Sequence, residues 1–100
     1  MKAIRVQYTV KDDFVETNHA NVRAVMEELR GKGNVGVKYT TFVLGDGRTF
    51  VHVAIHRDEA AADIIPSLPA FHTFRTALKD NVEVPPSSEE WTVVGTSYDV

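Results

Sequence analysis

A tight-turn signal near the middle of the chain constrains the fold more than any other feature. Gly45-Asp46-Gly47 lies between two runs rich in β-branched and aromatic residues, 35–44 and 48–56. An Asp-Gly pair between such runs is typical of a β-hairpin, because the tight turn needs positive φ and glycine supplies it. The sequence therefore predicts two adjacent antiparallel strands at the centre of the chain.

The segment before the hairpin predicts a strand and a helix. Residues 3–10 alternate apolar and polar side chains, which is the period of a half-buried strand. A helix is expected from about Asp13 to Arg30, because apolar residues recur there at helical spacing and glycine follows the last turn. Asp13 and Glu16 resemble a capping box at its start.

The segment after the hairpin predicts a second helix and a last strand. The helix is expected within 58–79, interrupted at Pro66 and Pro69, since proline lacks an amide hydrogen. Residues 81–90 contain Pro-Pro-Ser-Ser and are interpreted as a connection, and 91–98 as the closing strand.

The resulting order is strand, helix, strand, strand, helix, strand. This order defines a ferredoxin-like βαββαβ unit of the α+β class, with an antiparallel four-stranded sheet and two helices on one face. The chain of 100 residues is the size of one such domain, so we expect a single domain over 1–100.

The two faces of the predicted sheet differ in composition. Alternation places one set beneath the helices: Ile4, Val6, Tyr8, Val51, Val53 and Ile55. The opposite face would then carry Phe42, Phe50 and His52. An uncovered face with two aromatic side chains and a histidine suits packing against a second copy. We therefore predict a homodimer with these three residues at its interface. A sheet face that is simply exposed is the alternative.

Composition excludes several classes of function. The chain has no cysteine, which removes disulfides, thiolate metal sites and a cysteine nucleophile. The first ten residues alternate and do not resemble a signal peptide, and no apolar run is long enough to span a membrane. A cytoplasmic protein without membrane association is expected. The net charge of −3 with scattered basic residues argues against nucleic-acid binding.

Two specific alternatives are also disfavoured by the sequence. His52 and His56 would lie about 13 Å apart along one strand, too far to share a metal ion, so no metal site is predicted. An RNA-recognition module has the same topology, and its central strand has a basic-Gly-aromatic-small-aromatic pattern. The segment 48–53 reads Arg-Thr-Phe-Val-His-Val and lacks both the glycine and the second aromatic.

Several segments resemble one known family. These are the first strand KAIRVQYTV, the junction FVHVAIHRDEAA, the helix start LPAFHTFRTAL and the closing TVVGTSYDV. Together they resemble the dimeric α+β barrel superfamily, in particular small antibiotic-biosynthesis-monooxygenase-like proteins. The resemblance implies a homodimer whose sheets face each other, and a cavity between sheet and helices in each subunit. Members include cofactor-free oxygenases of aromatic polyketides, haem-degrading enzymes and proteins without assigned activity.

The sequence departs from the haem-degrading members. They have an asparagine on the first strand, where this chain has Gln7, and a tryptophan before the second helix, whereas Trp91 follows it. The haem-degrading members also have a histidine in the second helix. His72 lies in that helix here, but it shares a side with Arg75 rather than with Phe71 and Phe74. No haem and no other cofactor is therefore expected, and no catalytic residue is carried over from the family.

Candidate ligand-binding residues follow from helix and strand phase. Asn18 and His19 border the apolar stripe of the first helix, and Tyr8 and Tyr39 occupy apolar strand positions while keeping a hydroxyl. Core packing and helix-edge contacts are the ordinary roles of such residues. The break at the two prolines suggests a portal to the cavity. The candidates are Tyr8, Asn18, His19, Tyr39, Phe71 and Phe74, with His52 outside the cavity.

The sequence thus favours a dimeric α+β barrel that binds a small aromatic or apolar molecule. A cofactor-independent monooxygenase-like activity is one interpretation. A structural or regulatory barrel without chemistry is the other. A pocket of a few hundred Å³ with convergent polar groups distinguishes them, because a filled core leaves no room for a substrate.

Overall fold

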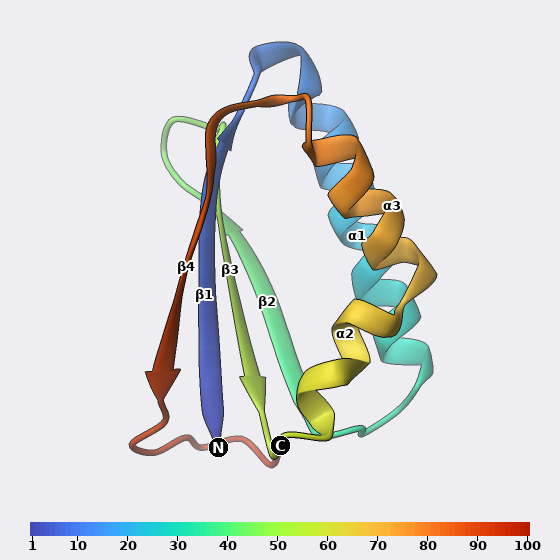
Figure 1. Ribbon diagram of the computed structural model, residues 1–100, viewed down its shortest axis with the longest axis vertical. Helices are drawn as coiled ribbons and strands as arrows, with labels where there is room; N and C mark the ends of the chain where they lie inside the picture. Colours follow the sequence, from blue (N-terminus) through green and yellow to red (C-terminus); the bar gives the residue numbers. More distant parts are fainter.

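A computed structural model describes all residues from Met1 to Val100. Its sheet contains β1 (Lys2–Val10), β2 (Val37–Val43), β3 (Thr49–His56) and β4 (Val82–Thr92) in the antiparallel order β2-β3-β1-β4. The helices are α1 (Val15–Gly31), α2 (Ile64–Ser67) and α3 (Pro69–Leu78), with short 3-10 turns at Asp12–Phe14 and Ala61–Asp63. All the helices lie on one face of the sheet, and the other face is bare (Figure 1). The ferredoxin-like α+β fold is confirmed.

The central hairpin forms as the turn signal predicts. Gly47 has φ +73°, a conformation that L side chains rarely adopt. The Asp46 carboxylate accepts hydrogen bonds from the backbone amides of Arg48, at 2.9 Å, and Thr49, at 2.8 Å. The Thr49 hydroxyl also donates to this carboxylate. The three hydrogen bonds lower the pKa of Asp46 to about 2, and the bond from the hydroxyl contributes most. The hairpin thus fixes β2 beside β3.

The second helix is broken where the prolines predict. Asp58 caps the first turn through a 2.9 Å bond from the Ala61 amide, α2 ends at Ser67, and α3 begins with Pro69. By contrast, Asp13 makes no cap: it lies within the first 3-10 turn, and the N-cap of α1 is Phe14, without a side-chain bond. No helix is both long and apolar enough to cross a membrane.

The last strand differs from the sequence prediction. It spans Val82–Thr92, so the segment interpreted as a connection is itself the strand, and most of 91–98 lies beyond it. The proline pair argued against a strand because proline cannot donate a hydrogen bond to the neighbouring strand. An edge strand tolerates proline, and β4 is an edge strand that pairs only with β1. Pro85 and Pro86 fall at a register shift opposite Tyr8, where a bulge leaves backbone groups unpaired.

The assignment of β3 to the two faces was wrong. Directly opposed residues of antiparallel strands share a face, and the register pairs Tyr8 with Phe50 and Val6 with His52. Phe50 and His52 therefore point toward the helices and are 2% and 4% exposed. They cannot lie at an interface on the open face. The half-buried Val51, Val53 and Ile55 face the open side instead. Alternation separated the two sets correctly, but both contain apolar residues, so only the register could assign them.

A candidate ligand site between the helices and the sheet

A chain of polar side chains crosses the covered face of the sheet. The Asn18 amide nitrogen on α1 donates to the Tyr8 hydroxyl on β1 at 2.9 Å. That hydroxyl lies 2.7 Å from Nε2 of His52 on β3. The other imidazole nitrogen, Nδ1, is 2.6 Å from the Tyr39 hydroxyl and 3.1 Å from the Thr41 hydroxyl, both on β2. One residue of α1 and three strands thus contribute to a single buried network.

One neutral tautomer of His52, with its proton on Nδ1, gives the Tyr8 hydroxyl proton an acceptor. The Tyr8 oxygen accepts from Asn18, and a hydroxyl proton buried without an acceptor is costly, so Tyr8 donates to Nε2 of His52. The neutral imidazole then carries its proton on Nδ1 and donates it to Tyr39. In this tautomer the Tyr39 hydroxyl accepts from His52, and its own proton has no partner in the chain. Tyr39 is therefore able to donate to a ligand oxygen.

Burial keeps every member of the network uncharged at neutral pH. It lowers the pKa of His52 to about 4, because the imidazolium would lose its hydration. The same effect raises the pKa of the Tyr8 and Tyr39 hydroxyls, and in Tyr8 the bond from Asn18 partly opposes it. The network thus supplies neutral hydrogen-bond donors and acceptors rather than a strong base.

Asn18 has one atom that the network leaves unsatisfied. The residue is 0% exposed, and its Oδ1 has no hydrogen-bond partner. Buried polar atoms in proteins almost always have a partner, from the chain, from water or from a ligand. Asn18 Oδ1 is therefore free to accept a hydrogen bond from a donor outside the chain.

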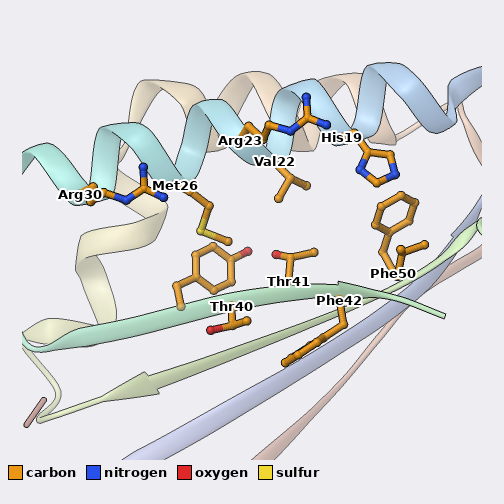
Figure 2. A pocket seen from close by; sticks show the side chains of 11 residues that line it. His19, Val22, Arg23, Met26, Arg30, Thr40, Thr41, Phe42 and Phe50 are labelled. Carbon is orange, nitrogen blue, oxygen red and sulfur yellow. The ribbon is translucent and has the colours of Figure 1, made fainter. Parts of the chain in front are cut away.

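The larger cavity next to the network lies between α1 and β2 and has a volume of about 350 Å³. Figure 2 shows Val22 and Met26 pointing down from α1 and Thr41 pointing up from the sheet. His19 and Phe50 close one end, with ring centroids 5.2 Å apart at an interplanar angle of 71° (Figure 2). The cavity is lined by His19, Val22, Arg23, Met26, Arg30, Tyr39, Thr40, Thr41, Phe42, Val43 and Phe50.

A second cavity of about 130 Å³ lies under the break between α2 and α3. This is where the sequence predicted the ligand cavity. Pro66 and Phe71 line it from the helices, and Tyr39 and His52 line it from the sheet. Phe74 fills the adjoining space, with its ring 5.3 Å from His52 and 6.2 Å from Tyr8. The larger space is therefore under α1, and the space at the proline break is small.

The predicted site residues separate into groups. Tyr8, Asn18 and Tyr39 meet in the hydrogen-bonded network, and His19 lines the larger cavity. Phe71 lines the smaller cavity, and Phe74 packs beside it at 5.7 Å between ring centroids. The expectation that His52 lies outside the cavity is wrong, since it joins the two tyrosines.

Thr41 was also missed by the sequence reasoning. Its position directly opposite His52 on the neighbouring strand was the signal that could have found it. No three histidine, aspartate or glutamate side chains cluster as metal ligands do.

Comparison with known proteins identifies the class of fold. No family model and no curated protein matches the sequence. An antibiotic biosynthesis monooxygenase structure superposes with a TM-score of 0.79 at 18% identity, covering 95% of this chain and 100% of its own. A Mycobacterium tuberculosis protein gives 0.78 at 15% identity, covering 97% and 98%. SnoaB, a cofactor-independent oxygenase from Streptomyces nogalater, gives 0.66 at 19% identity, covering 98% and 97%.

These superpositions cover nearly the whole chain at low sequence identity. The protein therefore has the fold of the antibiotic-biosynthesis-monooxygenase-like proteins. The family resemblance seen in the sequence is confirmed at the level of the fold.

Proposed function

We propose that this protein binds a small aromatic molecule in the cavity between α1 and β2 and acts on it as a cofactor-independent monooxygenase. The observation that carries the proposal is the Tyr39 hydroxyl. It ends the buried network, its proton has no acceptor in the chain when His52 is protonated on Nδ1, and Tyr39 is among the residues that line the cavity. A volume of about 350 Å³ is at the lower end of the range of small-molecule sites.

The chemistry matches what the network supplies. An anthrone-type substrate carries a methylene group opposite a ring carbonyl. Water takes one methylene proton, and the resulting enolate reacts directly with dioxygen. The methylene becomes a carbonyl, one oxygen atom enters the product and the other leaves as water. Tyr39 would donate to the oxygen on which the enolate charge develops. The similarity of fold to a cofactor-independent oxygenase supports this reaction class.

Oxygen consumption with 1,8-dihydroxyanthrone tests the proposal. The protein is expected to accelerate conversion to the anthraquinone above the rate without protein. Tyr39→Phe should lower the accelerated rate by at least about tenfold, because the donor is lost from a partly buried site. Tyr98→Phe is the matched control, since Tyr98 is exposed near the C-terminus. Binding of the anthrone without turnover would support the alternative, a barrel without chemistry.

The open face of the sheet supports a homodimer as part of this proposal. It carries Val51, Val53 and Ile55 along β3, flanked by Phe42 and Trp91, which are 52% and 42% exposed. These apolar side chains are interspersed with Arg5, Gln7 and Thr40, and a mixed face of this kind suits a partner surface of the same composition. Only Phe42 of the three predicted interface residues lies on this face.

A cytoplasmic location is proposed because the chain has no cysteine, which fits a reducing compartment.

A further inference from the structure

Two arginines on α1 differ from all the others in the chain. Arg5 pairs with Glu89, Arg48 with Asp12 and Glu83, and Arg57 with Asp58. Arg75 stacks over the Phe71 ring at 5.9 Å. Arg23 and Arg30 have no ion pair, no side-chain hydrogen bond and no aromatic partner. These two guanidinium groups are therefore available to an external anion.

Both of these arginines line the same cavity. They are seven residues apart on α1, so they stand on one side of the helix about 10 Å apart. Figure 2 shows them along α1, with Val22 and Met26 pointing from the same helix toward the sheet. Glu27 and Glu28 are the nearest carboxylates in sequence; neither lines the cavity or pairs with either arginine, and Glu28 accepts a hydrogen bond from the Ala70 amide. No aspartate or glutamate belongs to the lining.

The local charge is opposite to that of the whole chain. The protein carries a net charge of −3, whereas this cavity has two cationic side chains above apolar walls. Guanidinium groups bind carboxylates through paired, charge-assisted hydrogen bonds. The walls contributed by Val22, Met26 and Phe50 suit a flat apolar body.

We infer that the ligand of this cavity is an aromatic carboxylate, its ring between α1 and β2 and its anionic group held at the cavity mouth by Arg23 or Arg30. This inference deepens the proposed function by naming the class of substrate. The Tyr39 hydroxyl would bind a second oxygen of the ligand at the inner wall.

Calorimetric titration with 2-naphthoate and 2-naphthamide tests the inference directly. The two probes share one ring system and nearly one shape, and differ in charge. The unmodified protein should bind 2-naphthoate about three- to tenfold more tightly. Raising the salt concentration from about 50 to 500 mM should reduce this preference, because the ion pair is partly exposed and becomes screened.

Variants then test whether Arg23 and Arg30 cause the preference for 2-naphthoate over 2-naphthamide. The double variant Arg23→Gln/Arg30→Gln should bind both probes equally. Lys32→Gln removes one positive charge, as each single arginine variant does, from an exposed site outside the cavity, and should keep the preference for 2-naphthoate. Equal affinities in the unmodified protein, or a preference that survives in the double variant, would overturn the inference. The two single variants and the salt titration give the same decision if the double variant is unstable.

The result is separable from the proposed function. Equal binding of both probes together with anthrone oxidation would refute only the anionic class of ligand. Binding of neither probe, even when anthrone oxidation is observed, would also count against the inference. Absence of both binding and oxidation would refute the cavity as a site and the proposed function with it.

Discussion

The two faces of the sheet divide their residues in opposite ways. Beneath the helices, His52 and Thr41 of the sheet and Asn18 of α1 place polar side chains among aromatic rings. The bare face holds the half-buried Val51 and Val53 along β3, beside Arg5 and Gln7 of β1. In a typical monomer the interior is apolar and the exposed face of a sheet is polar. Here polar side chains lie in the interior and valines lie on the exposed face. This difference is the basis for proposing a ligand site beneath the helices and a partner on the bare face.

The largest expected effect comes from charging the covered face. Phe50→Asp should prevent folding, because Phe50 is 2% exposed and its ring stacks on Tyr8 at 5.7 Å between centroids. An aspartate there is a buried charge without a partner, a change that costs several kcal/mol in a domain of marginal stability. Circular dichroism and heteronuclear NMR should show an unfolded chain. A folded variant with altered oligomeric state would mean that Phe50 faces outward.

Charging the bare face should leave the fold intact and separate the subunits. Val51→Asp places a carboxylate between Gln7 and Phe42, and the diagonal cation Arg5 is already paired with Glu89. An unpaired charge at the centre of an apolar interface opposes association. Light scattering should show a folded monomer, while Val94→Asp, at an exposed position beyond β4, should remain a dimer. A monomeric unmodified protein at micromolar concentration would refute the dimer.

The extent to which the sequence predicts this arrangement depends on the range of the interactions. Asp46-Gly47 predicts the hairpin, and Pro66 and Pro69 predict the helix break, because local conformational preferences decide both. The strand β4 was missed, since only its edge position in the sheet makes Pro85 and Pro86 acceptable. That position is set by pairing with β1, at the other end of the chain.

The candidate site was predicted only in part for the same reason. Tyr8 and Asn18 are ten residues apart, and strand and helix phase brought them together correctly. The Tyr8–His52 contact joins residues 44 positions apart. It depends on the β1–β3 register, which alternation alone does not determine. The unpaired state of Arg23 and Arg30 likewise depends on where the carboxylates lie in space.

Acid should destabilise the covered face more than the bare one. The pKa of His52 is about 4 in the folded protein against 6.5 unfolded, so the unfolded chain binds more protons between these values. Its contribution to stability is complete above pH 6.5 and decreases as the pH falls toward 4, by up to about 1.4 kcal/mol per pH unit. Burial also lowers the pKa of His56, which adds a change of the same sign.

Urea unfolding at a series of pH values measures this effect. His52→Gln should be less stable at pH 7 but should have a flatter dependence between pH 4 and 6.5. His72→Gln, exposed on α3, should keep the dependence of the unmodified protein. An unchanged slope in His52→Gln would mean that the imidazole is not held neutral in the folded state.

The smallest effect, and the sharpest test of the buried network, is the loss of one hydroxyl. Tyr8→Phe keeps the ring in the core but leaves the Asn18 amide and Nε2 of His52 without their shared partner. Leaving buried polar groups unsatisfied should cost about 1–3 kcal/mol, which lowers Tm by several degrees in a domain of this size. Tyr98→Phe removes an equivalent hydroxyl from an exposed position and should leave Tm unchanged. Because no charge and little volume change, a loss of stability confined to Tyr8→Phe assigns the cost to the hydrogen bonds. Equal Tm values in the two variants would show that water replaces the Tyr8 hydroxyl without cost, and that the network does not stabilise the covered face.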